Sequence, residues 1–351
     1  MVNRLARSGS VTGDIAGNMT NGMTGIGVGL IGTGYAANAR AKALLADGRS
    51  HLVSISSGST SSRGVERAAK LAEQYGAQVV TYWQQLINDR AVELVVICTV
   101  SALHGEIVEA ALKSEKHVVV EYPLSLQVAQ AEQLVKLAAD KQLLLHVEHI
   151  ELLGGLHLAM RSHLPKVGKP SYVAYRTINP QSPAPKKWTY QTELFGFPFC
   201  GALSRVHRLT NLFGKVRQVN CQTRMLADAD GVHFRQILSS GRLLFESGLI
   251  AEVVYGKGER LCVYHREIEV QGDEGTLFFD RNEGTLTTAT ETSVIAVEPR
   301  RGLFVKDTKE VLDHLIDGNT LYVSAAESLY ALRVGDALQQ ASINGGTVNV
   351  V

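Results

Sequence analysis

A glycine-rich turn near the start of the chain has the residue types and the spacing that bind a dinucleotide. The turn Gly32-Thr-Gly-Tyr-Ala-Ala37 follows the apolar run Ile26–Ile31, and apolar residues then recur at helical spacing. A strand, a tight turn and a helix in this order form the G-x-G-x-x-A pattern, which brings backbone N–H groups and a helix N-terminus to a pyrophosphate. The alternative is a turn whose glycines serve only its shape. The predicted cofactor contacts in the turn are Gly32, Thr33, Gly34, Tyr35 and Ala36.

The next predicted strand ends in hydroxyl residues where an NAD-preferring fold carries an acid. Leu52–Ile55 is followed by Ser56, Ser57 and, after more serines, Arg63, with no Asp or Glu among them. A carboxylate there would bind the ribose hydroxyls and repel a 2′-phosphate, whereas hydroxyl and guanidinium groups can bind that phosphate. The segment therefore predicts a preference for NADP(H) through Ser56, Ser57 and Arg63. The alternative is a serine-rich loop with an unspecific ribose site.

Two later strands end in residues that can also face the cofactor. The apolar runs Leu94–Thr99 and His117–Glu121 are typical of parallel strands buried on both faces. Ligands of doubly wound sheets bind at the carboxyl ends of such strands. The alternatives are a structural histidine at His104 and a tyrosine that only packs at Tyr122. The predicted cofactor contacts are Thr99, Val100, His104, Glu121 and Tyr122.

The second half of the chain carries cations that could meet an anionic substrate. Lys186-Lys-Trp188 lies in a proline-rich loop, and Ser204-Arg-Val-His-Arg208 lies on a predicted helix. An arginine is a poor general acid, but it binds carboxylates bidentately and stabilises developing negative charge. The alternatives are ion pairs for the arginines, a solvated loop for the lysines and a core aromatic at Trp188. The predicted substrate contacts are Lys187, Trp188, Arg205 and Arg208.

The elements that must position these residues indicate an α/β fold of two domains. Strands alternate with helices as far as His149, which predicts a Rossmann domain with a parallel sheet over residues 25–149. Residues 150–345 then change to period-two alternation between Lys215 and Val297, which predicts an α+β domain with a large open antiparallel sheet. Residues 1–24, rich in Gly, Ser and Asn, are predicted to form a disordered extension.

Composition excludes several other classes of protein. A formal net charge of +1 predicts no attraction to nucleic acid or to an anionic membrane, and no apolar run reaches the length of a spanning helix. The four cysteines lack C-x-x-C spacing, which argues against a zinc site or a disulfide framework. No metal site is predicted, because His149 and Glu151 have no third ligand at a suitable spacing. We expect a cytoplasmic protein, and the sequence does not predict its oligomeric state.

The order of these motifs resembles the glucose-fructose oxidoreductase/inositol dehydrogenase family. The glycine turn, Thr99-Val-Ser-Ala-Leu-His104, Glu121-Tyr-Pro123 and a Trp before a Gly-led helix follow one another between about Ile26 and Gly335. In that family the third motif is usually Glu-Lys-Pro, whose Lys assists proton transfer from a sugar hydroxyl. The later helix usually carries an Asp and a His at the substrate. This chain departs from the family at both places.

Those departures resemble the cyanobacterial branch of the family that reduces biliverdin, a linear tetrapyrrole. Besides Tyr122 and Arg205, the chain shares Glu148-His-Ile-Glu-Leu-Leu153 and Phe195-Gly-Phe-Pro198 with that branch. The resemblance implies NADPH as the cofactor, biliverdin as the substrate, and hydride transfer to its central methine carbon, with Arg205 and Tyr122 as catalytic residues. A substrate without a reacting hydroxyl needs no Lys or Asp base. A sugar or polyol dehydrogenase and a non-catalytic NADP-binding regulator remain the alternatives.

Overall fold

The first half of the chain forms six parallel strands covered by helices. The computed structural model describes residues 25–350, so the extension predicted for residues 1–24 lies outside the described residues. The strands are β1 (Ile26–Ile31), β2 (Ser50–Ser56), β3 (Gln78–Val79), β4 (Leu94–Ile97), β5 (His117–Glu121) and β6 (Leu145–Glu148). They lie in the order β3-β2-β1-β4-β5-β6. The order reverses between β1 and β4, so the carboxyl ends of these strands form the expected ligand crevice.

The helices of this half cover both faces of the sheet. They are α1 (Tyr35–Asp47), α2 (Ser62–Tyr75), α3 (Trp83–Ile87), α4 (Ser101–Lys113) and α5 (Val128–Asp140). The central strands β1 and β4 are apolar and buried because helices pack against both of their faces. The Rossmann arrangement predicted from the sequence is confirmed.

The second half of the chain is built on a nine-stranded sheet. Its strands are β7 (Pro170–Pro180), β8 (Val216–Ala227), β9 (Phe234–Phe245), β10 (Ile250–Gly258), β11 (His265–Gly272), β12 (Gly275–Asp280), β13 (Glu283–Thr288), β14 (Thr292–Ala296) and β15 (Thr347–Asn349). They lie in the order β14-β13-β12-β11-β7-β10-β9-β8-β15. Strands β7 and β10 pair in parallel, and the other neighbours are antiparallel. The chain crosses from β7 to β8, then returns by hairpins through β9, so β10 reaches β7 in the same direction.

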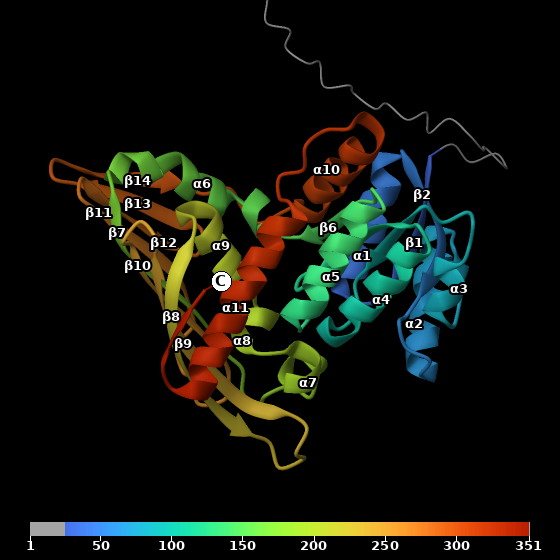
Figure 1. Ribbon diagram of the computed structural model, residues 1–351, viewed down its shortest axis with the longest axis horizontal. Coiled ribbons are helices and arrows are strands. Elements are labelled where there is room, and N and C mark those ends of the chain that lie inside the picture. The colour runs from blue at the N-terminus through green and yellow to red at the C-terminus, as the bar shows by residue number, and fades with distance from the viewer. Residues whose placement is uncertain (1–24, 351) are drawn as a thin grey trace, which may run out of the picture.

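Helices of the second half lie mainly between the two sheets. They are α6 (Gly155–His163), α7 (Thr192–Phe195), α8 (Pro198–Gly201), α9 (Ser204–Phe213), α10 (Leu303–Asp317) and α11 (Ala325–Asn344), with short 3₁₀ turns η1 (Ile150–Leu153), η2 (Leu164–Val167) and η3 (Trp188–Tyr190). Helix α11 packs on β8, α5 and α9, and so joins the two halves through one apolar core (Figure 1). None of the helices between residues 25 and 350 is long and apolar enough to span a membrane.

A buried ion pair fastens α10 to the first domain, although α10 comes late in the chain. Arg40 of α1 and Asp307 of α10 are completely buried and form a salt bridge. His146 Nε2 lies 2.9 Å from Asp307 Oδ1, and the Tyr322 hydroxyl donates to the same oxygen at 2.5 Å. Burial alone would raise the pKa of Asp307, but Arg40 and His146 hold it well below its usual range. The carboxylate is therefore ionised at neutral pH.

We expect Asp307→Asn to lower the free energy of unfolding by about 3–5 kcal/mol, because Arg40 stays buried without its main charged partner. The wild-type protein should lose this stabilisation as pH falls below about 4, since the unfolded carboxylate then binds the proton first. Denaturant unfolding at several pH values measures both effects. Asp317→Asn, at a half-exposed ion pair of the same helix, is the control. Equal losses in the two variants would contradict a structural role for the buried pair.

Candidate active site

The glycine turn leaves room for a ligand at one glycine and not at the other. Gly32 has a φ of +131°, and a Cβ there would lie 2.3 Å from the Cys98 carbonyl oxygen. Gly34, by contrast, has extended backbone, and apart from its chain neighbours no protein atom lies within 4 Å of the position of its Cβ. Gly34 is also the N-cap of α1 without a side-chain capping bond, so the first N–H groups of the helix face open space. These features fit a pyrophosphate. Of the other predicted contacts here, Thr33 and Ala36 are half-buried and Tyr35 is exposed.

At the ribose end of the predicted cofactor site lie hydroxyl groups and an arginine. Ser61 caps α2 by accepting a hydrogen bond from the Gly64 N–H at 3.2 Å. Arg63, in the first turn of α2, is exposed and forms no ion pair within residues 25–350. Ser57 is half-buried, whereas Ser56 is completely buried with its hydroxyl accepting from the Gly58 N–H at 3.4 Å. Arg63 is thus available to a 2′-phosphate, and Ser56 supports the turn. The Ser57 hydroxyl donates to the Ser59 carbonyl oxygen and accepts from the Ser59 N–H at 3.1 Å, so its contact with a phosphate stays a prediction.

His104 lies behind the strand ends and holds two of them together. Its Nδ1 lies 2.8 Å from the Pro123 carbonyl oxygen, and its Nε2 lies 3.3 Å from that of Thr99. Burial lowers its pKa, so the ring is neutral and donates from one nitrogen only. The geometry gives His104 a supporting place; a direct cofactor contact stays a prediction. Thr99 and Val100 are half-buried at the carboxyl end of β4.

Glu121, the last residue of β5, is directed towards the buried cluster around Asp307. Its Oε1 lies 3.5 Å from Arg40 Nε. Burial raises the pKa of Glu121, and burial together with the neighbouring Glu121 raises that of Glu148. A half-buried and a buried carboxyl group beside one arginine favour sharing a proton between them.

The two predicted catalytic residues come from different domains and meet at one hydroxyl group. Tyr122, directly after β5, donates its O–H to Ser204 Oγ at 3.2 Å. Arg205 of α9 donates from Nη1 to the same oxygen at 3.0 Å. Burial raises the pKa of Tyr122 to about 12, so its phenol stays protonated. Ser204 was not among the predicted contacts, because nothing in a serine next to an arginine shows that a tyrosine arrives from another domain.

The Arg205 guanidinium has an N–H donor that no described residue accepts. Its guanidinium carbon lies 5.3 Å from the centroid of the Tyr255 ring. Within the described residues it forms no salt bridge, and its buried Nε has no hydrogen-bond partner. A cation held by an aromatic face and one hydroxyl can receive an anion or a developing negative charge.

Arg208, one turn further along α9, has a different environment. It is buried and its Nη2 lies 3.3 Å from Glu151 Oε2. Arg300 also forms an ion pair with Glu151, and Arg266 lies 3.8 Å from it. Burial would raise the pKa of Glu151, but the surrounding arginines, Arg208 first, lower it. Arg208 is therefore engaged by Glu151, and its contact with substrate stays a prediction.

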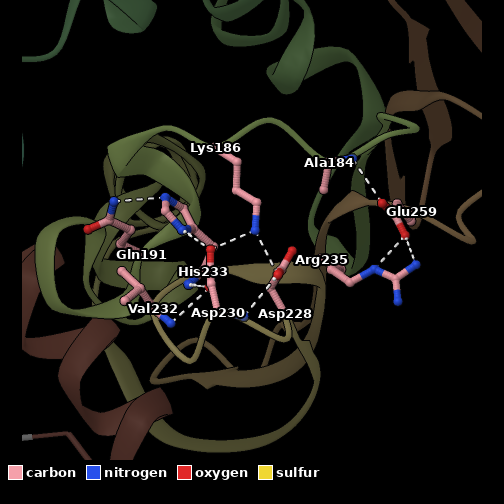
Figure 2. Close-up of polar contacts among 9 residues, drawn as sticks. All are labelled: Ala184, Lys186, Gln191, Asp228, Asp230, Val232, His233, Arg235 and Glu259. Carbon is pink, nitrogen blue, oxygen red and sulfur yellow. Dashed lines mark hydrogen bonds and ion pairs between the residues drawn. The ribbon is translucent and has the colours of Figure 1, made fainter.

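A loop over residues 181–191, here called the strap, crosses the end of the large sheet. Lys186 forms ion pairs with Asp228 at 2.7 Å and Asp230 at 2.6 Å, which anchors the strap to the turn between β8 and β9 (Figure 2). The Ala184 N–H donates to Glu259 at 3.1 Å on the other side (Figure 2). Lys187 is exposed and forms no ion pair within the described part of the chain, and Trp188 is half-buried with its ring 6.2 Å from that of Phe195.

A cavity of about 550 Å³ opens between the domains beside this group. It is lined by Ser125 and Gln127 of the first domain and by Thr192, Thr223 and Ile237 of the second, among others. The predicted site residues do not line it. Instead it borders strand β10, because Ile237 of β9 is the register partner of Lys257, and Thr223 pairs with Ser239 opposite Tyr255.

Lys257 is a further charged residue of this region that the sequence motifs did not single out. It lies on β10 on the same face as Tyr255 and is only 6% exposed. Its position in the strand alternation after Val253 and Tyr255 was the available signal, since that alternation places a lysine on the buried face.

Comparisons with known proteins agree with this architecture. Residues 26–149 match the model of the family described as "Oxidoreductase family, NAD-binding Rossmann fold". Residues 165–350 match the accompanying "Oxidoreductase family, C-terminal alpha/beta domain". A levoglucosan dehydrogenase solved in complex with NADH shares the fold, with a TM-score of 0.80, 18% identity, and coverage of 93% of this chain and all of that one.

Two sets of relatives have more sequence in common with the chain. The crystal structure of biliverdin reductase from Synechocystis sp. PCC 6803, in complex with biliverdin and NADP⁺, is 47% identical with a TM-score of 0.87, covering 90% of this chain and 98% of that one. Biliverdin reductase A of Mus musculus and of Homo sapiens are each 32% identical over 137 residues, which is 39% of this chain. The chain spans only 43% of the length of these two curated relatives. On the two family matches and the fold, the chain belongs to the Gfo/Idh/MocA oxidoreductase family.

Proposed function

We propose that this protein reduces biliverdin to bilirubin with NADPH. The observation that carries the proposal is the group formed by Tyr122, Ser204 and Arg205, in which an unpaired cation and two hydroxyl groups meet. A polyol dehydrogenase needs a base of near-neutral pKa to accept the proton of an alcohol. A protonated phenol and a guanidinium cannot accept it. Similarity to the Synechocystis biliverdin reductase over most of both chains supports the same reaction.

In the proposed reaction, bound NADPH supplies a hydride to the central methine carbon of biliverdin, and a proton reaches a pyrrole nitrogen. The turn at Gly34 and the N-terminus of α1 would hold the pyrophosphate, and Ser57 with Arg63 the 2′-phosphate. As the hydride arrives, negative charge grows on the tetrapyrrole, and the Arg205 guanidinium stabilises it. Ser204 accepts from both Tyr122 and Arg205, which fixes the direction of that cation and leaves the Ser204 O–H to donate to the substrate.

A spectrum tests the proposal. With NADPH present, the long-wavelength absorption band of biliverdin should be replaced by the shorter-wavelength band of bilirubin. Reduction of NADP⁺ by inositol or another polyol, without any change in biliverdin, would instead indicate a polyol dehydrogenase. A protein that binds NADPH but turns over neither substrate would be a non-catalytic NADP-binding protein.

The first prediction on this function concerns cofactor preference. We expect Arg63→Ala to raise the Michaelis constant for NADPH about tenfold while changing that for NADH little, because a charge-assisted hydrogen bond to the 2′-phosphate is lost. Steady-state kinetics with both cofactors measure the effect. Arg67→Ala, an exposed arginine one turn along the same helix, is the matched control. Equal changes for NADPH and NADH would contradict the assignment of Arg63 to that phosphate.

A further inference from the structure

Lys257 lies in a cage of aromatic rings at the end of β10. Its Nζ is 3.7 Å from the centroid of Phe195 of α7 and 4.9 Å from that of Tyr190 of the strap. Phe234 of β9 and Tyr255 of its own strand lie 5.3 and 5.9 Å away. The amine donates a hydrogen bond to the Thr189 carbonyl oxygen. These contacts hold the side chain in one place at the edge of the cavity described above.

Within residues 25–350 the charge on this amine has no counter-ion. An ammonium group has three N–H donors, and within residues 25–350 only the Thr189 carbonyl accepts one of them. The charged groups that face it are cations, Lys187 from the strap and Arg205 from α9. Phe195 and Phe234 bring no titratable group, and Tyr190 and Tyr255 are phenols whose pKa values burial raises. No carboxylate of the described residues forms a salt bridge with Lys257.

Burial, and then Lys187 and Arg205, lower the pKa of Lys257 to about 7. The aromatic faces stabilise the ammonium form in part. Lys257, Arg205 and Lys187 thus converge beside aromatic walls without an acid among them. Such an arrangement fits the carboxylate of a flat, conjugated ligand, whose ring system packs on the aromatic side chains.

We propose that Lys257 binds one carboxylate of the substrate and takes up a proton when that carboxylate arrives. The identity of the substrate rests on the proposed function: biliverdin carries two propionates, and Lys257 would hold one of them. The simpler role for Lys257 is to anchor the strap through Thr189, with no contact to a ligand.

The proposal fixes the sign of the pH dependence. In the free protein Lys257 is largely neutral above about pH 7, and an adjacent carboxylate raises its pKa. Binding above that pH must therefore be accompanied by protonation. The affinity for the ligand with free carboxylates should therefore fall as pH rises, by up to about tenfold per pH unit.

Calorimetric titration of the full-length protein tests this, with biliverdin and its dimethyl ester as probes in two buffers of different ionisation enthalpy at about pH 8. The wild-type protein should take up close to one proton with biliverdin and about none with the ester. Lys257→Met should lose the uptake and bind biliverdin roughly tenfold to a hundredfold more weakly, with the ester almost unaffected. Lys257→Arg keeps a fixed charge, so it should bind biliverdin without proton uptake. Lys186→Met, in the same strap but paired with Asp228, is the control.

The other outcomes decide against the proposal. Undiminished proton uptake in Lys257→Met would leave Lys257 as an anchor of the strap. The same would follow if this variant bound biliverdin and its dimethyl ester with equally reduced affinity. Thermal unfolding shows whether each variant is folded. If Lys257→Met is misfolded, the affinity and proton uptake of Lys257→Arg test the proposal instead. Biliverdin that binds with the predicted uptake but is not reduced would overturn the proposed function and leave the carboxylate site standing. If neither pigment binds the wild-type protein, both fail.

Discussion

Gly34→Val should abolish NADPH binding and leave the folded protein almost as stable as before. The backbone at Gly34 is extended, with φ −85° and ψ −169°, so a β-branched residue can adopt it without strain. Apart from its chain neighbours, no protein atom lies within 4 Å of its Cβ position, so the first atom of the valine side chain meets no other part of the protein. It would instead occupy the space into which the N-terminus of α1 directs its N–H groups, where the pyrophosphate must approach the backbone.

Fluorescence titration with NADPH and thermal unfolding measure the two halves of this prediction. Gly32→Val is the informative contrast, because a Cβ there would collide with the Cys98 carbonyl and the backbone has φ +131°. That variant should lose stability as well as cofactor. Nearly normal NADPH binding by Gly34→Val would mean that the cofactor does not lie against this turn.

The first domain could be predicted from the sequence because its signals are local. An apolar run, a glycine turn and an amphipathic segment recur within about 30 residues, the length of a βαβ unit. Strand β3 was not predicted, since its two residues, Gln78 and Val79, are exposed and carry no pattern. The docking of α10 on α1 was not predicted either. A helical pattern shows that Val311 faces a core, but not that this core belongs to the first domain.

Some residues of the candidate site could be predicted from the sequence, but the contacts between them could not. Tyr122 and Arg205 stood out because they replace residues typical of the family. The hydroxyl that links them, on Ser204, has a function only once β5 and α9 are brought together across 82 residues. Lys257 and Glu151 illustrate the same limit. Which cations have a carboxylate partner is a property of the packed structure, and that pairing separates Arg208 from Arg205.

Arg205→Ala should lower turnover at saturating biliverdin and NADPH by roughly a hundredfold, about 3 kcal/mol. In the proposed reaction, charge grows on the tetrapyrrole as it gains a hydride. A cation already held in place by Ser204 and Tyr255 stabilises that state more than the ground state. Arg205→Lys keeps the charge but loses the planar fork, so it should recover only part of the rate.

Steady-state kinetics distinguish this role from simple binding of a propionate. An arginine that only binds the substrate would, when removed, raise the Michaelis constant for biliverdin and preserve turnover at saturation. An arginine that acts on the transition state lowers kcat itself. Arg217→Ala, at an exposed arginine of β8, controls for the loss of a positive charge elsewhere on the domain. NADPH affinity and thermal unfolding should match those of the wild-type protein in every one of these variants. Wild-type turnover in Arg205→Ala would remove Arg205 from the chemistry and leave it as a clamp for the substrate.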